Sequence, residues 1–138
     1  MKYFILLCLL CLTALTSPAK TPSRDEVKVI SYNIRFVNKK DGANIWQNRA
    51  KASPAMIKDY APDVFGVQEA LFSQLEYLDE KLPKYSFVGV GREDGKKKGE
   101  TMAIFYNTRK VRLLDWGTYW LSETPDKPSR GWDADCKR

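Results

Sequence analysis

The fold class is decided by the stretch Val27-Lys-Val-Ile-Ser-Tyr-Asn-Ile-Arg35 and by a second one, Pro62-Asp-Val-Phe-Gly-Val-Gln-Glu-Ala70. β-Branched and aromatic residues dominate the first stretch, and its apolar side chains occur on both faces, which is typical of an interior strand. In the second stretch, residues 64–68 predict a short buried strand. Because a helical pattern separates the two, their order indicates a strand–helix–strand crossover with parallel pairing.

Two helices are predicted next to these strands. The first lies between Trp46 and Tyr60, where Ser53-Pro54 could cap a new start and where Met56, Ile57 and Tyr60 mark the inward stripe. The second is amphipathic and ends at Pro83; its apolar residues at helical spacing are Phe72, Leu75, Leu78 and Leu82.

Three more strands are expected later in the chain, at residues 85–90, 101–106 and 111–121. A charged, glycine-rich loop at residues 91–99 separates the first two. Together with the crossover, these strands predict an α/β fold. The sequence stops after Asp133-Ala-Asp-Cys-Lys-Arg138 without a closing element, so we expect an incomplete domain, since folded sheets normally pair or cover their edges.

The amino-terminal residues 1–19 have the pattern of a signal peptide. Lys2 is followed by an apolar run at residues 3–12 and by small residues up to Ala19. The apolar run is too short to span a bilayer comfortably. We therefore expect an exported protein, periplasmic or extracellular, without stable membrane insertion.

The remaining residues divide into a polar linker, residues 20–26, and the domain itself, residues 27–138. A lipid anchor on Cys8 or Cys11 is disfavoured, because neither follows the small residue that a lipoprotein cleavage site normally has before its cysteine. Cys136 is the one cysteine after the predicted signal peptide, so no intramolecular disulfide is expected.

The composition of the 138 residues bears on partners and chemistry. The formal net charge of +6 favours anionic partners such as phosphate esters or nucleic acid, although many basic exported proteins bind neither. The sequence contains no histidine, which removes the side chain most often used for proton transfer near neutral pH.

Two polar residues stand at the predicted carboxyl ends of the first two strands, Asn33 and Glu69. Ligands bind at these ends in sheets built from crossover units, so an amide oxygen and a carboxylate could face one hard cation there. The same pattern also fits ordinary turn or cap residues. A third acid, Glu100, stands before the strand at residues 101–106 and could orient a basic partner, or it could be a solvated loop residue.

Aromatic and basic residues offer a second kind of surface. Four tryptophans and three arginines could stack on bases or sugars and pair with phosphate; they are Trp46, Trp116, Trp120, Trp132, Arg35, Arg49 and Arg92. Core packing is the commoner fate of tryptophan, and a run such as Lys96-Lys-Lys98 is usually solvated.

Taken in order, several segments resemble the endonuclease/exonuclease/phosphatase superfamily of metal-dependent hydrolases. They run through nearly all of residues 27–138: Ser31-Tyr-Asn-Ile-Arg35, Trp46-x-x-Arg49, Pro62 to Ala70, Gln74, Gly89-Val-Gly-Arg-Glu-Asp-Gly95, Gly99-Glu100 before Ala103-Ile-Phe-Tyr106, and Trp120-Leu-Ser-Glu-Thr-Pro125 followed by Gly131-Trp-Asp133. Any single segment would be weak, but the ordered set is specific.

The resemblance implies a four-layer α-β-β-α sandwich, of which these residues supply about the first half. It implies Mg²⁺, or Mn²⁺, as the cofactor, with Glu69 as a direct ligand and Asn33 at the metal and its bound phosphate. Glu100 is similar to the acid that hydrogen-bonds a catalytic histidine in the family. Arg35 and Arg92 are interpreted as substrate-binding residues, Arg92 on the phosphate side.

The reaction implied by the resemblance is in-line attack of an activated water on phosphorus. The implied partner is a phosphoester substrate, either nucleic acid or a phosphorylated small molecule or lipid. The family's later motifs, which supply a histidine and two further aspartate motifs, do not occur in these 138 residues, so we expect no hydrolysis by this chain alone. The alternative hypothesis is a non-catalytic secreted module that binds a phosphorylated or sugar ligand.

Overall fold

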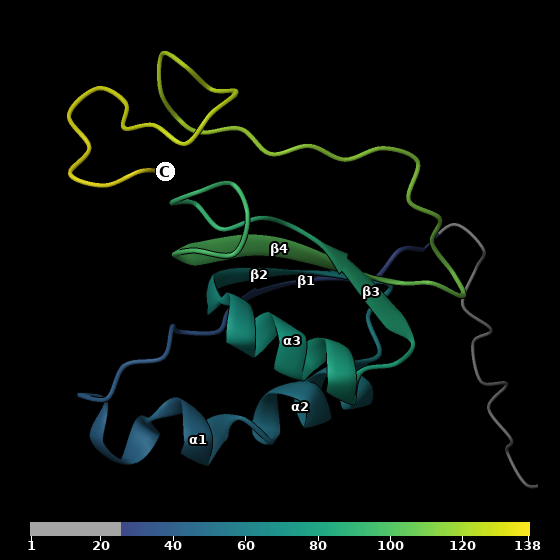
Figure 1. Ribbon diagram of the computed structural model, residues 1–138. Helices are drawn as coiled ribbons and strands as arrows, with labels where there is room; N and C mark the ends of the chain where they lie inside the picture. Colours follow the sequence, from purple (N-terminus) through teal and green to yellow (C-terminus); the bar gives the residue numbers. More distant parts are fainter. Residues whose placement is uncertain (1–25) are drawn as a thin grey trace, which may run out of the picture.

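A sheet with helices on one of its faces makes up the part of the chain that the computed structural model describes, residues 26–138 (Figure 1). In chain order the elements are β1 (Val29–Asn33), the 3-10 helix η1 (Gly42–Asn44), α1 (Trp46–Arg49), α2 (Ala52–Tyr60), β2 (Val64–Leu71), α3 (Phe72–Lys81), β3 (Tyr85–Val88) and β4 (Glu100–Asn107). The predicted signal peptide, residues 1–19, and residues 20–25 of the predicted linker lie outside the described residues. None of the helices within residues 26–138 has the length and apolar character needed to cross a membrane.

The strand order in the sheet is β1-β2-β4-β3. The predicted parallel pairing of β1 with β2 is confirmed, with Val29 opposite Val64 and Asn33 opposite Gln68. β4 runs antiparallel to both β2 and β3. β1 is therefore at an edge of the described sheet, and the prediction of an interior strand is wrong. The prediction assumed that apolar side chains on both faces of the strand are buried, but Val29, on the outer face, is 65% exposed.

The hydrophobic core lies between the sheet and helices α2 and α3, which cover one face (Figure 1). Phe65 of β2 and Phe105 of β4 stack with ring centroids 4.7 Å apart. Ile57 of α2 and Leu75 and Leu78 of α3 are fully buried in the same cluster. Each of these side chains stabilises the fold by about 1.5–3 kcal/mol through its burial. The helical spacing predicted for α3 is thus confirmed.

The first predicted helix is divided in the structure into α1 and α2. α2 begins at Ala52 rather than at Ser53-Pro54, and it tolerates Pro54 because that residue lies in the first turn. Ile57 is buried as predicted, but Tyr60 is 61% exposed. Tyr60 is the last residue of α2, and Ala61 takes a left-handed conformation that turns the chain away from the core.

Residues 111–138 cross the sheet on the side opposite the helices, without forming a helix or strand (Figure 1). The strand predicted at residues 111–121 is therefore wrong. Leu114 and Tyr119, which suggested it, are exposed. Met102 and Ile104 of β4 are also exposed, whereas the neighbouring Ala103 is buried toward the helices. Of the four-layer sandwich, the described residues thus form one sheet and one helical layer.

Candidate functional site

A β-bulge in β2 controls the direction of the Glu69 side chain. β2 pairs with β4 in register up to Val67 and again from Ala70, so Gln68 and Glu69 together oppose a single residue of β4. Glu69 has a φ of 60°, in the left-handed region that a residue with a Cβ rarely adopts. Bulges re-aim side chains in this way. The strand predicted at residues 64–68 does not end before Glu69 but continues to Leu71.

Asn33 and Glu69 are brought into direct contact at the end of the parallel pair. Asn33 Nδ2 donates a 2.8 Å hydrogen bond to Glu69 Oε1, and Asn33 Oδ1 accepts the backbone N–H of Arg35 at 2.9 Å. A backbone N–H only donates and a carboxylate only accepts, so both partners require the same amide orientation. In this arrangement Asn33 orients the carboxylate of Glu69. The role of Asn33 as a metal ligand stays a prediction.

The other carboxylate oxygen of Glu69, Oε2, is buried and has no hydrogen-bond partner. A buried polar atom without a partner costs about 1–3 kcal/mol, and more when it is charged. A divalent cation bound to Oε2 would supply the missing partner, because carboxylate oxygen is a preferred ligand of Mg²⁺ and Mn²⁺. Glu69 therefore fits such an ion.

The described chain has no cluster of acidic or cysteine side chains around Glu69. Within residues 26–138, no three His, Cys, Asp or Glu side chains are grouped closely enough to hold an ion. Mg²⁺ commonly uses one or two carboxylates together with water and substrate phosphate oxygens. A single carboxylate from this part of the chain is consistent with that pattern.

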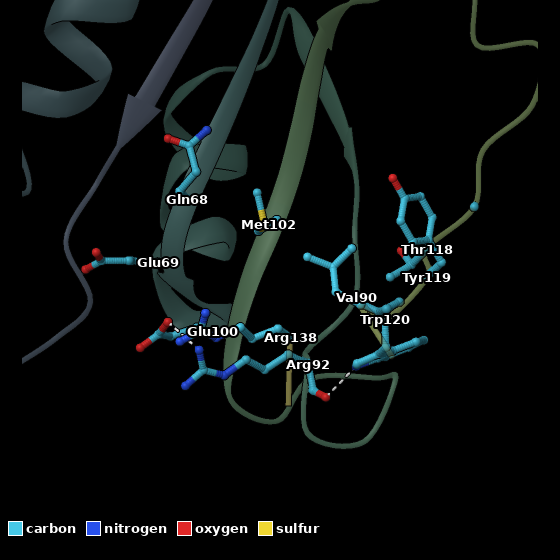
Figure 2. Close-up of a pocket in the computed structure, with 12 residues that line it drawn as sticks. Gln68, Glu69, Val90, Arg92, Glu100, Met102, Thr118, Tyr119, Trp120 and Arg138 are labelled. Carbon is cyan, nitrogen blue, oxygen red and sulfur yellow. Dashed lines mark hydrogen bonds and ion pairs between the residues drawn. The ribbon is translucent and has the colours of Figure 1, made fainter. Parts of the chain in front are cut away.

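Glu100, the first residue of β4, is paired with Arg92 rather than left in solvent. Arg92 Nη1 donates to Glu100 Oε2 at 2.9 Å (Figure 2). Arg92 Nε is buried without a hydrogen-bond partner, and Glu93 Oε1 lies 3.6 Å from it in an ion pair. Glu100 thus holds a basic partner, as one of its two predicted roles required, but the partner is an arginine. The guanidinium keeps a donor that an anion could use.

Arg35 is engaged by Asp41 in a two-point ion pair. Arg35 Nε donates to Asp41 Oδ2 at 3.1 Å, and Arg35 Nη2 donates to Asp41 Oδ1 at 2.9 Å. These hydrogen bonds hold the pKa of Asp41 below its ordinary value and raise the pKa of Arg35. Both groups are therefore charged at neutral pH. Two of the donors with which Arg35 was predicted to bind substrate are already used.

An open pocket of about 560 Å³ lies beside Glu69, between β4 and residues 117–121 (Figure 2). It is lined by Gln68, Glu69, Val90, Arg92, Glu100, Met102, Gly117, Thr118, Tyr119, Trp120, Leu121 and Arg138. Trp120 Nε1 donates to the backbone oxygen of Arg92 at 2.8 Å and so ties this segment to the loop before β4. In Figure 2 the Glu69 carboxylate points away from Trp120. The pocket combines apolar walls with two carboxylates, Glu69 and Glu100, and two guanidinium groups, Arg92 and Arg138.

The four tryptophans do not form one stacking surface. Trp46 is buried edge-on against Tyr77, which is the core role that the sequence left open. Trp120 is buried at the pocket, whereas Trp116 and Trp132 are exposed. Trp120 is thus the one tryptophan of the described chain that lines the candidate site.

Arg49 is a residue of this site to which the sequence gave no role beyond a possible phosphate contact. Its guanidinium donates to three backbone oxygens, those of Asn44, Ile34 and Arg35. The bonds to Asn44 and Arg35 are 2.9 and 2.8 Å long. Arg49 therefore holds the chain where it leaves β1, and three of its five N–H donors are used in doing so.

Gln74 is a second residue whose role the sequence did not suggest. It lies in the first turn of α3 and is fully buried. Its Oε1 accepts the backbone N–H of Leu71 at 3.0 Å, and its Nε2 donates to the backbone oxygen of Arg35 at 3.0 Å. The sequence could have indicated this role, because Gln74 is a polar residue beside the apolar stripe of α3. It also stands three positions after the N-cap residue, where a glutamine that caps the helix is common.

Comparison with known proteins places this fold among phosphoester hydrolases. No protein-family model matches the chain. A mannosyl-6-phosphatase from Bacteroides thetaiotaomicron has a similar structure, with a TM-score of 0.79 and 46% identity, over 82% of this chain and 43% of that one. An endonuclease/exonuclease/phosphatase from Bacteroides vulgatus gives a TM-score of 0.79 and 43% identity, over 81% of this chain and 43% of that one.

A curated relative gives the same picture at the level of sequence. Tyrosyl-DNA phosphodiesterase 2 of Rattus norvegicus is 31% identical over 113 residues, which is 72% of this chain and 30% of the relative. The chain spans less than half the length of each of these three proteins.

Proposed function

We propose that this chain, a member of the endonuclease/exonuclease/phosphatase superfamily, supplies the Asn33–Glu69 part of a divalent-metal-dependent phosphoester hydrolase site. The observation that carries the proposal is the buried, unpartnered Oε2 of Glu69, whose other oxygen is held by Asn33. A carboxylate held in this way has one oxygen directed at an ion before the ion arrives, which lowers the cost of binding it.

The roles of the side chains follow from their contacts. A divalent cation at Glu69 would withdraw charge from the phosphoryl oxygens during attack by water. Asn33 keeps the carboxylate in a single orientation. Arg92, fixed by Glu100, has a buried Nε without a partner and is proposed to face the phosphate. Glu100 is a positioning residue in this scheme.

Metal binding tests the proposal without requiring turnover. Mn²⁺ binding can be measured from the electron paramagnetic resonance signal of the free ion. The Glu69→Gln variant should bind Mn²⁺ at least about tenfold more weakly, because the carboxylate charge is lost. Glu76→Gln, on the exposed face of α3, is the matched control and should bind as the unchanged protein does. Equal affinity of the Glu69→Gln variant and the unchanged protein would remove the basis of the proposal.

Hydrolysis is proposed to need further residues that these 138 do not contain. The sequence has no histidine, and removal of one charge-stabilising group from such a site commonly costs on the order of a hundredfold in rate. The chain alone should therefore neither release phosphate from a phosphomonoester nor cleave a phosphodiester to a monoester and an alcohol above the uncatalysed rate. Metal-dependent hydrolysis of either substrate that is lost in the Glu69→Gln variant would overturn this expectation. Reading the encoding DNA past Arg138 for histidine and aspartate motifs gives an independent check.

The proposed substrate is a phosphorylated sugar rather than nucleic acid. The support is the 46% identity to a mannosyl-6-phosphatase, compared with 31% to tyrosyl-DNA phosphodiesterase 2. A pocket of about 560 Å³ lies in the size range of small-ligand sites. In a nuclear magnetic resonance titration, mannose 6-phosphate with Mg²⁺ should shift the signals of Arg92 and Tyr119. Tighter binding of a short single-stranded DNA would contradict the assignment, and sugar phosphate binding that needs neither Mg²⁺ nor Glu69 would favour the non-catalytic module.

Export of the protein is also proposed, from the pattern of residues 1–19. Amino-terminal sequencing of the mature protein should find Lys20 as the first residue. Retention of Met1 on the functional protein would contradict it.

A further inference from the structure

Four hydrogen bonds close a ring around the Asn33–Glu69 pair. Asn33 donates to Glu69 Oε1 at 2.8 Å and accepts the N–H of Arg35 at 2.9 Å. Gln74 donates to the backbone oxygen of Arg35 at 3.0 Å and accepts the N–H of Leu71 at 3.0 Å. The backbone from Glu69 to Leu71 completes the ring. Every donor in it meets an acceptor, so the ring fixes both side-chain amides in one orientation.

The ring joins two turns that are each unfavourable on their own. Arg35 and Glu69 both have a φ of 60°, although neither is glycine. Such conformations persist where the surroundings impose them. Arg49 also donates to the backbone oxygen of Arg35, but its hydrogen bonds in this region go only to residues that follow β1, not to the turn at Glu69. Gln74 is the side chain in the ring that contacts the backbone of both turns.

We infer that Gln74 is a positioning residue for the metal site. By joining the segment after β1 to the segment after the bulge, it keeps Asn33 against Oε1 of Glu69 and leaves Oε2 directed to the cation. The inference rests on the metal site proposed above. A glutamine suits the position because it offers one acceptor and one donor without charge, and Gln74 is fully buried, where a charge would be costly.

The Gln74→Met variant tests the inference, because methionine has a similar volume and makes neither hydrogen bond. Loss of a residue that hydrogen-bonds a metal ligand typically weakens metal affinity by about 10-fold to 100-fold. Gln74 acts one step further from the ligand, through the backbone of Arg35 and Leu71, so we expect the lower end of this range, about tenfold weaker Mn²⁺ binding. Without metal, the amide proton of Leu71 and the side-chain amide protons of Asn33 should exchange with solvent faster. Both quantities are measurable, by electron paramagnetic resonance and by nuclear magnetic resonance.

Two controls separate positioning from a general loss of stability. Leu78→Ala, one turn further along α3, removes a fully buried side chain and should lower the unfolding midpoint at least as much as Gln74→Met does. It should leave the Mn²⁺ dissociation constant within about twofold. Gln47→Met, at an exposed position of α1, should change neither quantity. If Leu78→Ala weakens Mn²⁺ binding as much as Gln74→Met does, Gln74 has no positioning role.

The two readouts also distinguish this inference from the function on which it rests. If the unchanged protein binds no Mn²⁺, or binds it equally well after Glu69→Gln, the proposed metal site is wrong. In that case amide exchange still tests whether Gln74 holds the ring together. Unchanged protection of the Leu71 and Asn33 amide protons in Gln74→Met would refute the positioning role as well. If Glu69→Gln weakens Mn²⁺ binding and Gln74→Met does not, the function stands and the inference fails.

Discussion

Replacing Glu69 with glycine should give a more stable protein than replacing it with alanine, the reverse of the usual order. Both changes remove the carboxylate, its bond from Asn33 and the buried Oε2. They differ in the backbone, because a φ of 60° costs a residue with a Cβ about 1–2 kcal/mol. Glycine loses more backbone conformational entropy than alanine on folding, and this offsets about 0.5–1 kcal/mol of the advantage that glycine has at a φ of 60°. The glycine variant should therefore be about 0.5–1 kcal/mol more stable than the alanine variant.

Urea unfolding of the two variants, followed by tryptophan fluorescence, measures this difference directly. The matched pair is Glu76→Gly and Glu76→Ala, at an exposed helical position of α3. There alanine should be the more stable residue by about 1 kcal/mol. The sign should thus invert between the two positions. A glycine variant at Glu69 that is no more stable than the alanine variant would refute the strained bulge.

Two further predictions concern the supports of the site and of β2. Arg49→Lys should lower the free energy of unfolding by about 1–2 kcal/mol in urea, because a single ammonium cannot reach the three backbone oxygens that the guanidinium holds. Hydrogen bonds from Lys110 and from the backbone N–H of Lys28 lower the pKa of Asp63 in the folded protein. The ionised Asp63 carboxylate therefore stabilises the fold at pH values above its unfolded-state pKa of about 4. This stabilisation is lost as the pH falls through the lower folded-state pKa. Asp63→Asn should lower the free energy of unfolding by about 1 kcal/mol at pH 7. Measured by thermal unfolding, the stability of this variant should fall less steeply at acid pH than that of the unchanged protein. An unchanged slope at acid pH would contradict this role of Asp63.

The sequence was sufficient to predict that Asn33 and Glu69 lie close together at one edge of the sheet, although not that they are hydrogen-bonded to each other. Residue patterns marked the two strands, and the rule for strand–helix–strand units gave their parallel pairing, which brings both carboxyl ends to one edge of the sheet. The bulge was not predictable in the same way. It depends on the register of β2 against β4, a pairing between residues distant in the chain, and no glycine marks the left-handed residue.

Burial at the sheet edge and in the later chain was harder to predict. Val29 and residues 111–121 have strand-like composition, but propensity does not reveal whether another layer covers them. The roles of Arg49 and Gln74 were missed for a related reason. Both bind the backbone oxygen of Arg35, which carries no sequence signal of its own, and the position of Gln74 in the chain suggested only its cap on Leu71.

The most direct measurement of the claim that Glu69 is a metal ligand is anomalous diffraction from crystals of the protein grown with Mn²⁺. We predict a peak about 2.1 Å from Glu69 Oε2, with Asn33 Nδ2 still bonded to Oε1. No peak at saturating Mn²⁺, or a peak on another carboxylate such as Asp41, would contradict the claim.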